Sequence, residues 1–208
     1  MPTKTIKRAY NSSRRTLQAA QTRDEVLRAA VQLFATTGWA GTTLAAIADE
    51  AGVSVETIYN GFGSKKGLLE AARDFSLAGD SEPIPIVERP EFHAMGEGSL
   101  DERIAHAASV TAEIHGRSAG VWKAIIEAAS ADEEVDGWRL EQEEGRHGVL
   151  GQAITLVLDR PPDEPLLDMC WILYGPETYL KLVHDRGISR DDYEAFLIDA
   201  TKRLIAGG

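Results

Sequence analysis

The stretch that most limits how this chain can fold runs from Thr42 to Phe62 and reads TTLAAIADEAGVSVETIYNGF. From Leu44, apolar residues recur at positions i, i+3, i+4 and i+7, which is the spacing of one buried helix face. Gly52 follows and can adopt the left-handed conformation that ends a helix, and Ser54 can then cap the amides of a second helix. Two short helices joined by a glycine-containing turn are the sequence pattern of a helix-turn-helix.

The second helix, predicted from Val55 to Phe62, has two different faces. Ile58 and Phe62 lie four residues apart and can pack inward together. The remaining positions are small, polar or aromatic, and they are Val55, Glu56, Thr57, Tyr59 and Asn60. Such a face suits a helix that contacts base edges in a DNA groove.

These helices belong to a longer ordered pattern of residues. The pattern contains Leu33, Phe34, Gly38, Gly41, Thr42, Thr43, Ile47, Ala48, Ala51, Gly52, Val53, Ser54, Thr57, Ile58, Tyr59, Phe62, Ser64, Lys65, Leu68 and Leu69. Through it, residues 22–72 resemble the N-terminal domain of the tetracycline-repressor (TetR) family of transcription regulators. The resemblance implies an all-α protein, with an N-terminal helix-turn-helix DNA-binding domain and a C-terminal helical domain for ligand binding and dimerisation.

The helix pattern and the resemblance together predict which residues contact DNA. They are Thr42, Thr43, Ser54, Val55, Glu56, Thr57, Tyr59, Asn60, Lys65 and Lys66. Thr42 or Thr43 should cap the first of the two helices, and in the family this cap clamps a phosphate. Lys65 and Lys66 lie in the first turn of the next helix, where a cation opposes the helix dipole, so a DNA phosphate is their expected partner. Gly61 departs from the family's pattern and predicts a frayed end of the reading helix.

Charge divides the chain into a basic part and an acidic part. Residues 1–78 contain ten Lys and Arg against seven Asp and Glu, whereas residues 79–208 contain twelve against twenty-six. We predict a DNA-binding domain at 22–78, whose first helix begins at a Thr22 capping box, and an effector-binding and dimerisation domain at 79–208. Residues 1–21 are predicted to be a flexible basic arm that lies along phosphates, although a solubilising tail explains their composition equally well. The basic residues near this end are Lys4, Lys7, Arg8, Arg14, Arg15 and Arg23.

Residues 79–98 contain three prolines and three glycines. They predict a long non-helical connection, and its apolar IPIV stretch should lie against the body of the protein. From Ser99 onward the sequence predicts helices with short breaks. Ser99 should cap a helix that ends near Gly116, a second helix follows directly, and Ser130 should cap a long helix that ends at Asp159.

The resemblance also implies an effector pocket and a dimer interface in the C-terminal helices. Bulky residues that could line the pocket are Trp122, Trp138, His147, Trp171 and Tyr174. Apolar residues of the last helices that could form the interface are Leu173, Tyr179, Tyr193, Phe196, Leu197 and Leu204. Both sets also fit an intramolecular core, and the sequence does not decide between these roles.

No catalytic residue, metal site or cofactor is predicted, because there is no G-x-S-x-G, H-E-x-x-H or C-x-x-C motif and no pair of histidines at i, i+4. The chain lacks an apolar signal segment and a transmembrane stretch, so we expect a cytoplasmic protein without membrane contact. The predicted function is transcription regulation, by a ligand-responsive repressor that binds an inverted-repeat operator in double-stranded DNA as a homodimer. Two alternatives remain: a helical interaction module that keeps the helix-turn-helix as a scaffold, and a small-molecule-processing enzyme.

Overall fold

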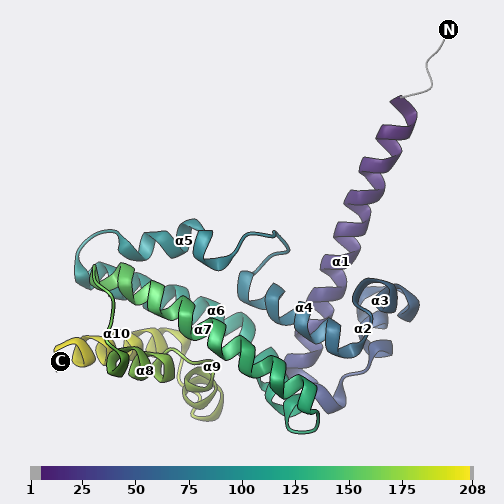
Figure 1. Cartoon of the computed structure of the whole chain (residues 1–208). Coiled ribbons are helices and arrows are strands. Elements are labelled where there is room, and N and C mark those ends of the chain that lie inside the picture. Colours follow the sequence, from purple (N-terminus) through teal and green to yellow (C-terminus); the bar gives the residue numbers. More distant parts are fainter. Residues whose placement is uncertain (1–5, 207–208) are drawn as a thin grey trace.

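The computed structural model describes residues 6–206, with side chains from Arg14 onward, and its regular elements in this range are all helices. The all-α prediction is therefore confirmed. The N-terminal domain contains α1 (Ile6–Gly41), α2 (Leu44–Ala51), α3 (Val55–Phe62) and α4 (Lys65–Ala78). These helices lie at one end of the molecule, and the first part of α1 stands clear of the body (Figure 1).

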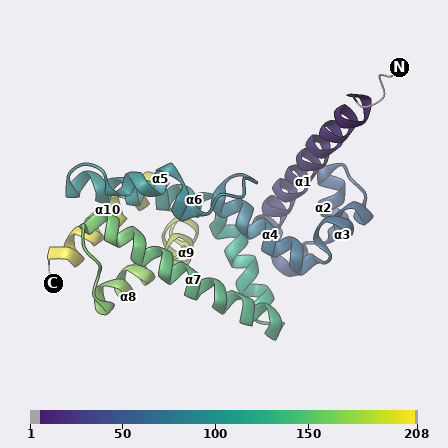
Figure 2. The same ribbon diagram turned by 45° about the horizontal axis from the view of Figure 1, so that its top comes forward.

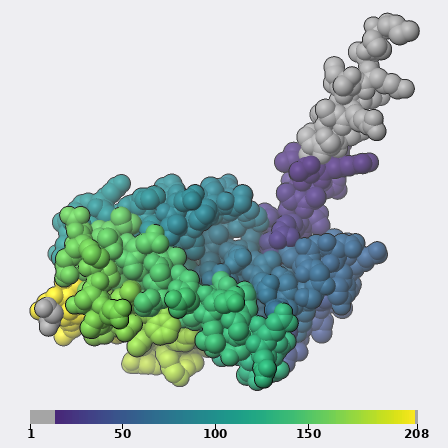
Figure 3. Space-filling view, viewed as in Figure 1, coloured from purple at the N-terminus to yellow at the C-terminus, as the bar shows by residue number. Residues whose placement is uncertain are grey.

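The C-terminal domain is organised around one central helix, α6. Its elements are η1 (Ile86–Glu88), α5 (Pro90–His93), η2 (Ala94–Gly96), α6 (Leu100–Ala129), α7 (Glu133–Leu158), α8 (Glu164–Leu173), α9 (Pro176–Tyr179), the π-helical η3 (Leu180–Asp185) and α10 (Arg190–Ala206). Helix α6 packs against α1 and α4 as well as against α7, α9 and α10. Helices α2 and α3 lie at the opposite end of the molecule from α10 (Figures 2 and 3). Among the helices of residues 6–206, none is both long and apolar enough to span a membrane.

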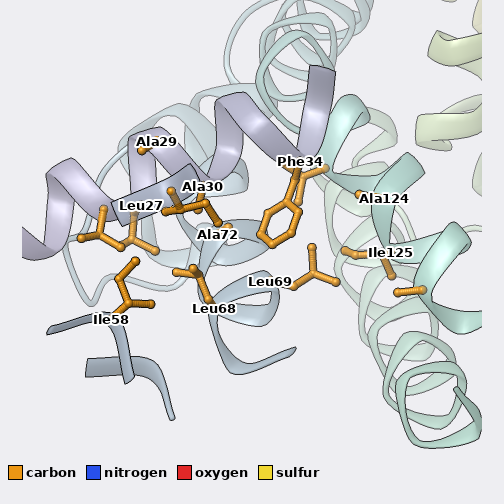
Figure 4. Close-up of a cluster of buried hydrophobic side chains, with 14 of the residues drawn as sticks. Leu27, Ala29, Ala30, Phe34, Ile58, Leu68, Leu69, Ala72, Ala124 and Ile125 are labelled. Atoms are coloured by element: carbon orange, nitrogen blue, oxygen red, sulfur yellow. The ribbon is translucent and has the colours of Figure 1, made fainter. Parts of the chain in front are cut away.

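One core joins the two domains. Figure 4 shows side chains from α1, α3, α4 and α6 converging on the same cluster, and those that are almost completely buried include Leu27, Phe34, Ile58, Leu68, Leu69 and Ile125. Full burial of each large apolar side chain contributes about 1.5–3 kcal/mol. Because α6 supplies Ile125 to this cluster, the position of the N-terminal domain is coupled to that of α6.

The first helix begins earlier than the sequence predicted. Thr22 lies inside α1, which extends back to Ile6, so the predicted helix start at Thr22 is wrong. The segment before it continues the helix because residues 14–21, RRTLQAAQ, contain neither glycine nor proline. Residues 6–21 of the predicted flexible arm are thus helical, while residues 1–5, with Lys4, lie outside the described residues. The helical path breaks at Gly38 (φ 72°), as predicted.

Two predicted boundaries in the C-terminal domain are also wrong. Helix α6 passes through Gly116 without a break, because burial of the residues on its packed face outweighs the roughly 1 kcal/mol that an interior glycine costs. Ser130 ends α6, and Asp132 caps α7 instead by accepting from two amides of its first turn. The capping box of Ser99 and Glu102 is formed as predicted.

The prediction that the connection at 79–98 is non-helical is wrong, since it contains η1, α5 and η2. Pro90 begins α5, where its missing amide costs no helical hydrogen bond. Phe92 of α5 and Met95 of η2 are buried and pack in a cluster with Ile104 of α6 and Val157 of α7. The connection therefore lies against the body, as its apolar residues indicated.

Two residues predicted for a dimer interface belong instead to the intramolecular core. Tyr193 and Leu197 of α10 are fully buried and pack with Ala108 and Ala112 of α6. Their predicted place at an interface is wrong, because the small alanine side chains let α10 pack closely onto α6. Phe196 is 39% exposed, and the other three candidates, Leu173, Tyr179 and Leu204, are partly buried.

Candidate nucleic-acid interface and effector cavity

The two helices α2 and α3 are fixed by hydrogen bonds at their ends. Thr43 caps α2, and its hydroxyl accepts from the Ala46 amide at 3.1 Å. Gly52 ends α2 in the left-handed conformation, with φ 66°. Ser54 caps α3 by accepting from the Thr57 amide at 3.1 Å, and the two hydroxyls lie 2.9 Å apart. The turn between the helices is thereby held in one geometry.

Helix α3 turns almost all of its side chains to solvent. Ile58 is 1% exposed, and Phe62 is partly buried against the core. The five side chains predicted to face DNA are exposed, and they are Val55, Glu56, Thr57, Tyr59 and Asn60. The helix is therefore anchored by one side and free to contact a partner with the other.

Neighbouring helices hold the end of α3, which the sequence predicted to be frayed. Arg23 of α1 donates to the Gly61 carbonyl at 3.4 Å, and its guanidinium lies 4.5 Å from the centre of the Phe62 ring. At Gly67 of α4, an added Cβ would lie only 2.3 Å from the Phe62 carbonyl oxygen. Fraying is thus opposed by α1 and by the close approach of α4.

Gly61→Ala is expected to stabilise the protein by about 0.5–1 kcal/mol, because alanine restricts the unfolded chain and favours helix. The space around a Cβ at Gly61 is open, so no clash offsets this gain. Urea unfolding measures the change. Gly67→Ala is the matched control and should destabilise by about 1–3 kcal/mol through its clash with Phe62. Equal effects of the two substitutions would contradict the close packing of α4 on α3.

Thr42 and Thr43 have different roles. Thr42 is 2% exposed; its hydroxyl lies 2.6 Å from the Gly38 carbonyl, to which it donates, and 2.7 Å from the Thr37 hydroxyl. The predicted contact of Thr42 with a phosphate is therefore wrong, because the side chain closes the turn between α1 and α2. Thr43 is exposed and remains the candidate phosphate contact.

Lys65 and Lys66 have partners within the chain, which the sequence did not reveal. Lys65 donates to the Trp39 carbonyl, with its ammonium 4.0 Å from the centre of the Trp39 indole, and burial lowers its pKa. Lys66 pairs with Glu134 of α7 at 2.5 Å, and that hydrogen bond raises its pKa. A DNA phosphate is therefore not required to hold either cation at the start of α4, and the helix-dipole argument for both phosphate contacts is lost. The contact of Lys65 that the family resemblance implies stays a prediction.

A carboxylate from α6 holds the turn before α2. Glu127 accepts from the amides of Trp39 and Ala40 at 2.7 and 3.0 Å. An added Cβ at Gly38 would lie 2.5 Å from the same carboxylate, so glycine is needed there for space as well as for its positive φ. We call the residues 38–40 the Trp39 turn. No local sequence signal marks Glu127, because its partners lie almost ninety residues away.

A cavity of about 980 Å³ lies between the two domains, within the upper range of pockets that take small ligands. The connection 79–95, α4, α6 and α7 supply most of its wall. A smaller chamber of about 60 Å³ adjoins it, and the two share Met95, Thr111, Leu150, Ala153 and Tyr174. The remaining wall of the smaller chamber is almost entirely apolar.

The charged groups of the large cavity are mostly paired with one another. The pairs are Arg73 with Asp74 at 2.7 Å, Arg89 with Asp80 at 2.7 Å, Arg117 with Glu113 at 2.6 Å and Arg146 with Glu143 at 2.6 Å. Arg89 lowers the pKa of Asp80 to about 2. The wall therefore presents little uncompensated charge to a ligand.

The structure brings only part of the predicted effector pocket together. Trp122 and Tyr174 line the large cavity, and Trp122 donates to Glu177 at 2.6 Å. Trp138 instead packs against the core that joins the domains. His147 and Trp171 lie edge to face with each other and line neither cavity. The sequence missed Thr111 and His115, which line the cavity from α6 without a local signal.

The structure has a helix-turn-helix attached to a helical body, which is the architecture of a class of DNA-binding regulators. Comparison with known proteins supports this class. Residues 26–72 match the model of the "Bacterial regulatory proteins, tetR family". The HTH-type transcriptional regulator AlkX of Mycobacterium tuberculosis is 48% identical over 48 residues, a match that spans 23% of each chain. Residues 26–72 therefore have the sequence of a TetR-family DNA-binding domain, and less than a quarter of that relative's length is matched.

Solved structures show that the similarity in fold extends over most of the chain. A putative TetR-family regulator from Rhodococcus sp. superposes with a TM-score of 0.66 at 21% identity, covering 88% of this chain and 98% of that one. A putative TetR-family regulator from Mesorhizobium loti gives 0.63 at 17% identity, covering 90% and 96%. At such identities the likeness concerns the fold.

Proposed function

We propose that this protein is a ligand-responsive repressor that binds an inverted-repeat operator as a homodimer and does not act as an enzyme. The observation that carries the proposal is α3 itself. Its predicted reading side chains are all exposed, while Ile58, the Ser54 cap and Arg23 hold the helix in place. A rigid helix with a free polar face is what reading base edges in the major groove requires.

Dimerisation is supported by exposed apolar side chains on helices that pack together. Ile172 and Met169 of α8 are 67% and 45% exposed, and Phe196 of α10 is 39% exposed. We call these three residues the α8–α10 patch. Two copies joined through it by a two-fold axis would bury this surface.

Ligand response is supported by the position of the large cavity. Its wall includes Leu27 of α1, Phe75 of α4 and Trp122 of α6, which belong to different helices. A ligand that fits only one arrangement of these helices would shift the population of DNA-binding conformations.

Selection of bound fragments from genomic DNA tests the proposal most directly. We expect an inverted repeat whose half-site centres lie about one helical turn apart, roughly 34–36 Å, or somewhat more. Equal binding of a direct repeat would contradict the two-fold arrangement. Failure to enrich any sequence would favour the alternative in which the helix-turn-helix is only a scaffold.

Asn60→Ala is expected to relax base preference at one position of each half-site by about 1–3 kcal/mol, since asparagine can bind adenine through two hydrogen bonds. Affinity for nonspecific DNA should change little, because Asn60 carries no charge. Competition binding with single-position operator variants measures this. Arg15→Ala on the exposed face of α1 is the matched control, which should weaken all sequences alike and reduce the salt dependence if Arg15 contacts a phosphate. Uniform weakening by Asn60→Ala would contradict its role as a reader.

A further inference from the structure

Helix α6 presents two polar side chains to the large cavity from one face. Thr111 and His115 lie four residues apart, so they are neighbours on the helix surface, and both line the cavity. Thr111 also lines the smaller chamber. The inference that follows concerns the ligand of this cavity and rests on the proposed function.

The hydrogen bond of His115 sets which ring nitrogen carries the proton. Its Nδ1 lies 3.0 Å from the hydroxyl of Tyr193, which is fully buried and has no other hydrogen-bond partner among the described residues. A buried hydroxyl hydrogen without an acceptor is costly, so Tyr193 donates and Nδ1 accepts. The neutral ring then carries its hydrogen on Nε2. Burial lowers the pKa of His115 to about 3, and the charge of Arg146 adds to this, so the ring is neutral near pH 7.

The Nε2 hydrogen of His115 is available to the cavity. Nε2 has no hydrogen-bond partner among the described residues, but it is not completely buried. It is therefore in contact with open space. The ring is 6% exposed and packs edge to face on Tyr179 on another side. The open space that Nε2 reaches is therefore the cavity that His115 lines.

Thr111 supplies a second polar atom of the same kind. Ser118 on the same helix donates to the carbonyl one turn earlier, that of Ile114, at 2.8 Å. The Thr111 hydroxyl makes no such bond and has no other partner within the part of the chain that the structure describes. Two adjacent hydrogen-bond donors thus face the cavity without an acceptor.

The surroundings of these donors disfavour a charged ligand. Two arginines of the wall, Arg117 and Arg146, are already paired with Glu113 and Glu143 at 2.6 Å. A carboxylate beside these donors would therefore be desolvated without help from either arginine, and an ammonium would offer no acceptor to the two donors. Beyond Thr111 the wall becomes apolar, and the smaller chamber can take the end of an alkyl chain.

We propose that the cavity binds an uncharged, largely aliphatic molecule whose single oxygen acceptor lies between the Thr111 hydroxyl and His115 Nε2, with its chain directed toward the smaller chamber. Such a ligand would be recognised through a neutral oxygen, and not through an ion pair between a carboxylate and an arginine.

Direct titration of the free full-length protein with octan-2-one, octanoate and octylamine tests the proposal, because the three compounds share a chain and differ in the head group. The ketone should bind, and the two ions should bind at least about tenfold more weakly. Thr111→Val should weaken ketone binding about fivefold without loss of stability, since the hydroxyl has no protein partner. The double variant His115→Phe/Tyr193→Phe, which removes both partners of the buried hydrogen bond, should weaken it similarly.

Thr155→Val on α7 is the control, because Thr155 lines neither cavity, and it should leave ketone affinity unchanged. Octanoate binding as tightly as the ketone, no binding of the ketone, or unchanged ketone affinity in both cavity variants would overturn the proposal. Operator binding is measured separately with and without ketone. Ketone binding that leaves DNA affinity unaltered would refute the ligand response in the proposed function while supporting the ligand assignment.

Discussion

Ile172→Asp is expected to convert the proposed homodimer into a folded monomer and to weaken binding to an inverted-repeat operator by on the order of a hundredfold or more, because the second half-site is no longer bound by a linked α3 helix. Ile172 is 67% exposed, so the substitution costs little within one chain. At a two-fold interface the new carboxylate would be desolvated near its own symmetry copy. Light scattering and operator titration measure the two effects.

Two other aspartate substitutions serve as controls, one at an exposed leucine outside the patch and one at a buried leucine. Leu140→Asp on the first half of α7 replaces a leucine that is 54% exposed, and it should leave the dimer intact because Leu140 lies outside the α8–α10 patch. Leu197→Asp should instead unfold the C-terminal domain, since Leu197 is fully buried and a buried unpaired charge costs several kcal/mol. A persistent dimer in both Ile172→Asp and Phe196→Asp would place the interface elsewhere.

The parts of the fold that could be predicted from the sequence are those set by local interactions. Ser54 and Ser99 cap their helices as predicted, because each hydroxyl accepts from an amide only three residues ahead. Helix α6 could not be predicted as one element, since the packing that overrides Gly116 comes from residues distant in the sequence. The same reason explains why the interface candidates on α10 were divided between core and surface.

The candidate site shows the same division. The exposed face of α3 followed from its helical period and one buried residue, Ile58. The choice between Thr42 and Thr43 depended on where α1 ended, and the partners of Lys65 lay in another helix. A cavity is space left between elements, so bulky residues in the sequence indicated its wall only partly.

The Trp39 turn is where the reading helices are attached to the C-terminal domain. Glu127 of α6 binds two of its amides, and Lys65 of α4 binds the Trp39 carbonyl and indole. The Phe34 ring stacks on the Trp39 indole, with the two ring centres 6.0 Å apart. Three helices therefore fix the point from which α2 and α3 begin.

Glu127→Ala is expected to destabilise the protein by about 2–3 kcal/mol, because two amides lose a charged acceptor and a partly exposed turn recovers only some of that loss from water. Amide hydrogen exchange should accelerate in the Trp39 turn and in α2, while the core around Tyr193 should remain protected. Glu127→Gln keeps one oxygen acceptor and should show a smaller effect. Glu144→Ala, on the exposed face of α7, is the control and should change neither quantity. If Glu127→Ala left exchange in α2 unchanged, the apolar contacts of α6 with α1 and α4 alone would position the reading helices.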